Sequence, residues 1–274
     1  MQTHEVFADR QRQVVIKRYV QNERGEAARE WRALTLLAAH APGLAPEPVR
    51  ADLTATPPVV EMSLLPGEPL GGVPLTAEQE RGLVRALRQL WESVPAAAVF
   101  PVDGETGQVE QLLTRIRDLD AIGRDPGDDR VVRLAMAEGR RWLQFATDGG
   151  TLRIEPGDSE TPFALGQGDA YLANFLWDGE RVRIVDFEDS GASDRPFELA
   201  VLVEHISAWH ECGLDGDGFA AAFGLSATES ARLAEGRRLA ALFWLLMLMP
   251  GGRASRRNPP GTLQQQAERL LALL

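Results

Sequence analysis

Two kinds of hydrophobic pattern alternate over the first 65 residues of the chain. Residues 12–20, RQVVIKRYV, are rich in β-branched side chains and predict a strand, with a shorter partner strand at Val6–Phe7. Residues 25–43 place apolar side chains at helical spacing and end in Pro-Gly, which predicts a helix. Val59–Ser63 predicts a buried strand, and the Pro/Gly-rich stretch over 66–74 behind it marks the best internal boundary.

Beyond this boundary the helical pattern dominates. A hairpin is embedded in it, because the apolar runs FLW and RVRIVDF are joined by Asp178-Gly179, a pair that favours a type I′ turn. The fold class predicted is α+β, with a small strand-rich part over 1–65 and a larger, mostly helical part over 66–274. Helices are predicted over 76–94, 109–119, 129–146, 196–211, 228–249 and 262–274.

Composition narrows the class of protein. A chain of 274 residues with 44% hydrophobic and 25% charged residues is long enough for one large domain or two lobes. The net charge of −11 argues against a nucleic-acid partner and suits a cationic small molecule, although an acidic surface also serves solubility. Cys212 is the single cysteine, which excludes an intramolecular disulfide and a thiolate zinc cage.

Nothing in the sequence predicts a membrane partner. The first residues are polar and lack the apolar stretch of a signal peptide. The most apolar run, over 239–249, is too short to span a bilayer and follows a charged segment. We therefore expect a cytoplasmic protein.

Candidate chemistry gathers in LGQGDAYLANFLWDGERVRIVDFED, residues 165–189. Folding the hairpin brings Asn174 and Asp186 to the same open end, where their oxygen atoms suit a hard cation such as Mg²⁺. Asp169 lies in the loop before the hairpin and is a candidate to accept a proton from a hydroxyl group. Glu188 either supports the metal or faces the substrate, and the sequence leaves both roles open.

A second candidate pair lies in the N-terminal part. Lys17 shares a strand face with Val15, and Glu30 falls on the apolar stripe of the predicted helix. A charge on each of two facing apolar surfaces predicts an ion pair that presents the lysine to a polyphosphate. The alternative is a lysine that reaches solvent and a hydrated glutamate.

These segments carry a resemblance. VVIK, REWRALTLL, VVEMSLLPGEPL, GQGDAYLANFLW and IVDFEDSG followed by DRPFELA stand in the order and spacing of the aminoglycoside phosphotransferase family. The resemblance covers nearly the whole chain and implies a two-lobed protein-kinase-like fold. It implies an N-lobe over 1–65 with the nucleotide-binding sheet and helix, and a C-lobe over 66–274 with the catalytic loop, the metal site and the acceptor-binding helices.

The resemblance also implies a role for individual residues. Asp169 is the expected catalytic residue facing the acceptor hydroxyl, Asn174 and Asp186 are expected to hold Mg²⁺, and Asp194 to brace the catalytic loop. The residues expected to bind the nucleotide are Lys17 and Glu30 at the phosphates, Met62 behind the adenine, and the hinge from Ser63 to Leu65 along the base.

The sequence departs from the family pattern in two places. Gln167-Gly168-Asp169 replaces the usual His-Gly-Asp, and a glutamine can still form hydrogen bonds there. Only sixteen residues precede Lys17 and none is glycine, so we expect a truncated N-lobe without a glycine-rich loop. Less protein then covers the nucleotide, or the start lies too far downstream, or nucleotide binding is impaired.

The function implied is that of a small-molecule kinase. It would move the γ-phosphate of ATP or GTP, with Mg²⁺, to a hydroxyl of a small molecule, with a cationic antibiotic such as an aminoglycoside as the expected acceptor. The first alternative is a catalytically impaired kinase-like protein that binds a nucleotide or ligand. A metal-dependent hydrolase using Asp169 and Asp186 ranks last, because the histidines are scattered. The acceptor, the choice between ATP and GTP and the oligomeric state stay open.

Overall fold

The computed structural model describes residues 4–99, 107–152 and 162–274 and divides the chain into two compact units. Unit 1 consists of Met1–Glu105 and Phe163–Arg195, and unit 2 of Thr106–Pro162 and Pro196–Leu274. The chain thus leaves unit 1 once and returns to it with the predicted catalytic segment. All the residues predicted to carry chemistry belong to unit 1.

A four-stranded antiparallel sheet begins unit 1. Lys17 lies opposite Val60, and Val15 lies opposite Met62, so these side chains share one face of the sheet. Three of its strands match the predicted pattern, whereas β3 was missed, because PVRAD is short, largely solvent-exposed and begins with proline. In spatial order the strands are β1 (Glu5–Asp9), β2 (Val14–Arg18), β4 (Val59–Ser63) and β3 (Pro48–Asp52).

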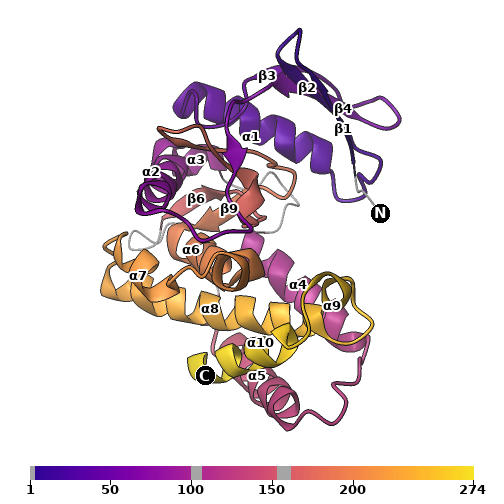
Figure 1. Cartoon of the computed structure of the whole chain (residues 1–274), viewed down its shortest axis with the longest axis vertical. Helices are drawn as coiled ribbons and strands as arrows, with labels where there is room; N and C mark the ends of the chain where they lie inside the picture. Colours follow the sequence, from indigo (N-terminus) through magenta and orange to yellow (C-terminus); the bar gives the residue numbers. More distant parts are fainter. Residues whose placement is uncertain (1–3, 100–106, 153–161) are drawn as a thin grey trace. The chain divides into compact units, whose positions relative to one another are not determined.

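One helix covers this sheet. The helix α1 (Glu26–His40) contacts β3 and β4, which lie beside it in Figure 1. Its buried stripe includes Ala27, Leu34 and Leu37 at helical spacing, and Glu30 lies within it as predicted. A carboxylate buried at this position is costly unless a cation pairs with it, so its partner is important.

The rest of unit 1 combines short strands with helices. The helix α2 (Ala77–Ser93) starts with a capping box between Thr76 and Gln79 and contacts β6 and β8. A Cβ at Gly82 of α2 would lie 2.8 Å from the Trp177 ring, so only glycine allows this packing. The remaining elements are β5 (Glu68–Pro69), α3 (Ala96–Val99), β6 (Phe163–Gly166), the 3₁₀ turn η1 (Leu172–Asn174), β7 (Phe175–Trp177), β8 (Val182–Ile184) and β9 (Gly191–Asp194).

The predicted hairpin is present as β7 and β8, with Phe175 opposite Ile184. Its predicted type I′ turn is wrong. Asp178 N–H donates to the Arg181 carbonyl, so the turn centres on Gly179 and Glu180, one residue later than predicted. Of these two only Gly179 has a positive φ, of 99°, whereas a type I′ turn needs two such residues. The Asp178 carboxylate accepts from the N–H groups of Glu180 and Arg181 and so stabilises the observed turn.

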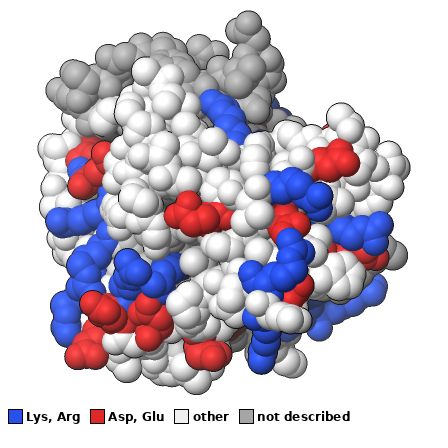
Figure 2. Space-filling view, turned by 90° about the horizontal axis from the view of Figure 1, so that it is seen from above, with Lys and Arg blue, Asp and Glu red and all other residues white. Residues whose placement is uncertain are grey.

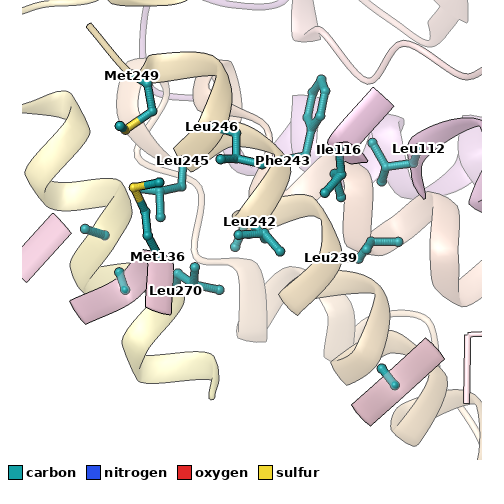
Figure 3. Packing of buried hydrophobic residues seen from close by; sticks show 14 of the residues in the cluster. Leu112, Ile116, Met136, Leu239, Leu242, Phe243, Leu245, Leu246, Met249 and Leu270 are labelled. Atoms are coloured by element: carbon teal, nitrogen blue, oxygen red, sulfur yellow. The ribbon is translucent and has the colours of Figure 1, made fainter. Parts of the chain in front are cut away.

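Unit 2 is built from helices around a large hydrophobic core. Figure 3 shows Leu242 of α8 (Ala227–Leu248) between Ile116 of α4 (Gln108–Ala121) on one side and Met136 of α5 (Arg130–Asp148) and Leu270 of α10 (Thr262–Leu273) on the other. The apolar run that is too short for a membrane is therefore a core helix. In unit 2 the helices are α4 (Gln108–Ala121), α5 (Arg130–Asp148), α6 (Arg195–Glu204), α7 (Gly216–Ala221), α8 (Ala227–Leu248), α9 (Arg253–Arg257) and α10 (Thr262–Leu273), with α6 starting at the last residue of unit 1.

The helix predicted over 196–211 is interrupted. The helix α6 ends at Glu204, and a π-helical turn (Ser207–Glu211) follows. His205 Nδ1 accepts the Ser207 N–H and lies 2.7 Å from its hydroxyl, so a side chain replaces a helical carbonyl at this point. Within the described residues no helix is long and apolar enough to cross a membrane.

Surface charge is mixed. On the face shown in Figure 2, acidic and basic side chains lie near one another, and no field of a single sign covers it. The net charge of −11 is thus not concentrated on that face.

Candidate functional site

A cavity of about 360 Å³ lies within unit 1, between the four-stranded sheet and the segment around β7 and β8. A volume of this size suits a small-molecule ligand. Most of its wall is apolar, and the charged groups gather at one end. The lining residues that carry the argument are Lys17, Glu30, Met62, Asn174, Asp186 and Glu188.

The predicted ion pair between strand and helix is present. Lys17 Nζ donates to Glu30 at 2.8 Å, and both side chains are buried. Glu30 also accepts from the Tyr19 hydroxyl and, at 3.2 Å, from the Phe187 N–H. The carboxylate therefore holds together the strand, the helix and the segment that follows the hairpin.

Two further carboxylates share the Lys17 ammonium. Nζ lies 2.5 Å from Asp186 and 2.6 Å from Glu188. Burial alone would lower the pKa of Lys17, but the charges of Glu30, Asp186 and Glu188 outweigh it and raise the pKa. Lys17 is therefore a firmly protonated cation with more negative than positive charge around it.

Asp186 has a special backbone conformation. Its φ of 64° lies in the left-handed region, which few residues other than glycine adopt and which aspartate tolerates better than most. Gln167 Nε2 donates to the carbonyl of Asp186 at 2.7 Å and to that of Val185 at 3.2 Å. This side chain stabilises the turn in which Asp186 leaves the strand.

Gln167 also contacts the other side of the loop, since its Oε1 accepts the Asp169 N–H at 2.9 Å. One buried glutamine thus connects the loop of Asp169 to the turn of Asp186. The departure from His-Gly-Asp keeps hydrogen bonding at this position, as predicted.

Asp169 and Asn174 face each other. Asn174 Nδ2 lies 3.2 Å from both the carbonyl and the carboxylate Oδ2 of Asp169. Burial, with the charges of Asp186 and Asp189, raises the pKa of Asp169 to about 6, against the hydrogen bond from Asn174. A carboxylate of this kind is a stronger base than a free aspartate.

Glu188, whose role the sequence left open, lies inside the charged cluster. Its Oε2 lies 2.6 Å from Lys17 Nζ and 2.9 Å from His4 Nε2. Burial and the charge of Asp186 raise the pKa of Glu188 to about 7, against the attraction of Lys17. Burial, together with the Lys17 charge, lowers the pKa of His4 and favours its neutral form.

The oxygen donors at this end of the cavity fit a divalent cation. Glu30, Asp186 and Glu188 each offer a carboxylate oxygen within 4.8 Å of the others. Asn174 lines the same end, and because its Nδ2 donates to Asp169, its oxygen remains as an acceptor. A set of carboxylate and carboxamide oxygens is what Mg²⁺ prefers.

The predicted base-binding residues line the apolar part of the cavity. Met62, Ser63 and Leu65 all contribute to its wall. The N–H of Ser63 donates to the Glu47 carbonyl, and that of Leu64 to the Gln13 carbonyl, each at 2.9 Å. The N–H groups of Ser63 and Leu64 are therefore already hydrogen-bonded within the fold.

Sequence reasoning missed two side chains of the site. His4 lies in the short run before the first strand, and its ring packs 4.8 Å from the ring of Tyr19. The Tyr19 hydroxyl donates to Glu30, and the centre of its ring lies 5.0 Å from Lys17 Nζ. The position of Tyr19, two residues after Lys17 on the same strand face, was a usable signal, whereas His4 offered none.

Solved structures of low sequence identity share the fold. A choline/ethanolamine kinase family protein from Mesorhizobium loti has 19% identity and a TM-score of 0.63, covering 100% of this chain and 84% of its own. Aminoglycoside phosphotransferase APH(4)-Ia has 14% identity and a TM-score of 0.67, covering 100% and 91%. Choline kinase LicA from Streptococcus pneumoniae has 14% identity and a TM-score of 0.61, covering 99% and 89%. The two-lobed kinase-like α+β fold predicted from the sequence is confirmed.

The comparison with curated proteins gave no match. A family model, by contrast, matches most of the chain, over residues 4–236, and is described as a phosphotransferase enzyme family. This range includes every residue of the site described above. The predicted resemblance is thereby confirmed, and the chain belongs to this phosphotransferase family and is a small-molecule kinase.

Proposed function

We propose that this protein transfers the γ-phosphate of ATP or GTP to a hydroxyl group of a small, amino-bearing molecule. The observation that carries the proposal is the convergence of Lys17, Glu30, Asn174 and Asp186 at one end of a cavity, with Asp169 hydrogen-bonded to Asn174. Phosphoryl transfer needs positioning and charge neutralisation more than covalent chemistry, and these groups supply both.

The nucleotide is proposed to enter with its base between Met62 and Leu65, along the segment that includes Ser63, and its phosphates toward Lys17. The apolar wall of the cavity suits the faces of a purine. Lys17, fixed by Glu30, would contact the α- and β-phosphates. On this view residues 1–65 form the nucleotide-binding lobe and 66–274 the lobe that binds the acceptor.

Asn174 and Asp186 are proposed to hold Mg²⁺. When bound there, the ion neutralises the charge of the β- and γ-phosphates. Asp186 has 35% of its side chain exposed, so its carboxylate is accessible from the cavity. Asn174 contributes its oxygen while its nitrogen keeps Asp169 in place.

Asp169 is proposed to accept the proton of the acceptor hydroxyl as the oxygen attacks the γ-phosphate. Its raised pKa, about 6, lies closer to neutral pH than that of a free aspartate, which improves a general base. The bond from Asn174 orients the carboxylate without removing its accepting oxygen atoms.

Support for a cationic acceptor comes from charge and from the fold relatives. The chain has a net charge of −11. Related folds include an APH(2″)-IIa complex with streptomycin and ATP and the spectinomycin phosphotransferase APH(9)-Ia with ADP and spectinomycin. An aminoglycoside or another amino alcohol is our proposed acceptor, and phosphorylation of an antibiotic would confer resistance. We place the reaction in the cytoplasm, where nucleotides and Mg²⁺ are available.

An alternative is a kinase-like protein that binds nucleotide without transferring phosphate. It is favoured by the β1–β2 turn over residues 10–13, which has no glycine to close over a phosphate.

Replacing the proposed base decides between the two functions. Asp169→Asn keeps the size of the side chain and removes the basic oxygen. We expect turnover to fall by roughly 10²–10⁴-fold while the affinity for Mg-nucleotide changes little. The measurements are nucleoside-diphosphate release, with ATP and with GTP, against a panel of amino-bearing alcohols with mass detection of the product, and calorimetry with Mg-ADP.

The matched control is Asp118→Asn, an exposed aspartate of α4 outside the site. It should behave as the parent protein. Full turnover in the Asp169→Asn variant would remove Asp169 from the mechanism. Nucleotide binding by the parent protein with no product from any acceptor would favour the binding protein.

A further inference from the structure

The helix α5 has one face in the core of unit 2 and one face in solvent. Val132, Ala135 and Met136 are buried in that core. A Cβ at Gly139 would lie 3.0 Å from the Leu242 side chain, so the helices pack closely here and fix how α5 is turned about its axis. Figure 1 shows α8 and α10 on one side of α5, and both contact it. The other side is therefore held toward solvent.

Two large apolar side chains lie on this exposed face. Phe145 is 73% exposed and Leu134 is 50% exposed. They stand eleven positions apart, about three helical turns, and so point in nearly the same direction. A single exposed apolar side chain is ordinary on a protein surface. The residues around these two decide whether the face has a partner.

Charged residues complete a row along the same face. Between the two apolar residues, Arg141 Nη1 lies 3.2 Å from Glu138 Oε2, and their side chains are 68% and 35% exposed. An exposed basic residue begins the row and an exposed acidic residue ends it. At 100° per residue all members fall within an arc of about 80°. In chain order the row consists of Arg130, Leu134, Glu138, Arg141, Phe145 and Asp148.

This row is complementary to itself when it is turned end to end. Leu134 and Phe145 lie equally far from its middle, and so do Glu138 and Arg141. A two-fold axis through the middle therefore places Leu134 opposite Phe145 of a second copy, and Glu138 opposite the Arg141 of that copy. The two oppositely charged ends of the row also meet, to within one position. Apolar thus faces apolar, and each charge faces its opposite.

The spacing of the row suits a second helix. From Leu134 to Asp148 the steps are four, three, four and three residues. This is the repeat of 3.5 residues that keeps a row of side chains facing a neighbouring helix in a coiled coil. Two such helices lie side by side at a crossing angle of about 20°.

We propose that the exposed face of α5 pairs with the same face of a second copy of this chain, in an antiparallel two-fold contact. The pairing buries Leu134 and Phe145 and joins the Glu138 and Arg141 charges of both copies into a neutral network. A partner with charge of one sign would leave the other sign of the row unmatched, whereas a second copy matches both. The inference is independent of the proposed function, because no residue of the nucleotide cavity takes part.

The contact is expected to be weak. The helix has 19 residues and is therefore about 28 Å long, so a single helix pair buries less surface than a standard stable interface. We expect a dimer dissociation constant of about 10–100 µM. Sedimentation velocity of the whole chain, from about 1 to about 500 µM, covers this range and should show a reversible monomer–dimer equilibrium.

Phe145→Ser removes the larger apolar side chain of the row. The dissociation constant should rise about 100-fold, because each substitution counts twice in a two-fold contact. The matched control is Phe7→Ser, the same change at a phenylalanine of β1 that is 52% exposed. It should leave the dissociation constant unchanged. Circular dichroism melting confirms that each variant is folded.

Exchanging charges tests the two-fold geometry itself. Glu138→Arg makes both central positions of the row basic, and Arg141→Glu makes both acidic, so each variant alone should stay monomeric up to about 500 µM. An equal mixture of the two variants should dimerise with nearly the parent affinity, because each basic pair then faces an acidic pair. The control is Arg85→Glu, at an exposed arginine of α2, which should neither dissociate the parent dimer nor rescue Glu138→Arg.

Three results would overturn the proposal. A parent protein that stays monomeric at every concentration excludes a second copy as the occupant of this face. A dimer whose dissociation constant is the same in Phe145→Ser and Glu138→Arg uses another surface. A mixture of Glu138→Arg and Arg141→Glu that stays monomeric, although both variants melt at the parent temperature, excludes the antiparallel pairing.

Discussion

Each unit buries a charged group among opposite charges, and the two arrangements differ in balance. In unit 1 one ammonium, Lys17, has three carboxylates within 2.8 Å. In unit 2 one carboxylate, Glu204, is fully buried between Arg237 and Arg269, at 2.7 and 2.9 Å. Arg237 also pairs with Asp217, so this second group of charges is neutral overall.

The difference separates a site that needs a ligand from one that is complete. The cluster at Lys17 sets one ammonium against three carboxyl groups, lies on a cavity, and gains a counter-charge if a cation binds. The cluster at Glu204 satisfies its carboxylate with arginine donors and needs no ligand.

The largest effect is expected from removing the cation of unit 1. Lys17→Met leaves three carboxylates without their ammonium and the phosphates without a contact. We expect kcat/KM for Mg-nucleotide to fall roughly 10²–10³-fold, as when one electrostatic donor is removed from an active site. We also expect millimolar Mg²⁺ to raise the melting temperature of this variant more than that of the parent protein, because the excess charge is larger. Activity assays and thermal unfolding with and without Mg²⁺ measure both.

An equal rise in melting temperature with Mg²⁺ in the two proteins would contradict an excess of negative charge around Lys17. Calcium chloride at the same ionic strength and sodium chloride are the controls, since simple screening acts with all three salts.

The next largest effect concerns the balanced cluster of unit 2. Glu204→Gln keeps the shape of the side chain but places an uncharged amide between two arginines. We expect the free energy of unfolding to fall by about 3 kcal/mol, the scale for breaking a buried ion pair. The matched change in unit 1, Glu188→Gln, should cost less than about 1 kcal/mol, because Lys17 keeps Glu30 and Asp186. Urea denaturation of both variants measures the two values, and equal losses would remove the distinction between the clusters.

The sequence predicted those features of the molecule whose signals lie within a short stretch of the chain. The helices over 77–93 and 227–248 each begin with a capping box, and their predicted ends lie within one or two residues of the observed ones. The ion pair of Lys17 and Glu30 was predictable because each charge interrupts an apolar row. The enzyme class is confirmed by the family match.

The misses needed information from the fold. The turn at Gly179 shifted by one residue because the Asp178 side chain binds the backbone N–H groups that follow it. The α-helix ends at Glu204 because the Ser207 N–H donates to the His205 side chain instead of to a helical carbonyl. His4 meets Glu188 only through the tertiary structure, because the two lie 184 positions apart in the chain and no periodicity connects them.

The smallest effect concerns a buried histidine of unit 2 and depends on pH. Burial lowers the pKa of His205 to about 3, so the folded protein keeps it neutral while the unfolded chain takes up a proton below its ordinary value of 6.5. The stability it contributes is therefore complete above pH 6.5 and decreases as the pH falls toward 3, by about 2 kcal/mol at pH 5. His205→Gln should lose stability less steeply than the parent protein between neutral pH and pH 5, while His40→Gln, at an exposed position, keeps the parent slope. Urea denaturation followed by tryptophan fluorescence suits the measurement, because Trp244 packs 4.7 Å from the His205 ring. Identical slopes for His205→Gln and the parent would show that the folded protein accepts the proton at this position, and that burial in unit 2 is less complete around His205 than around Glu204.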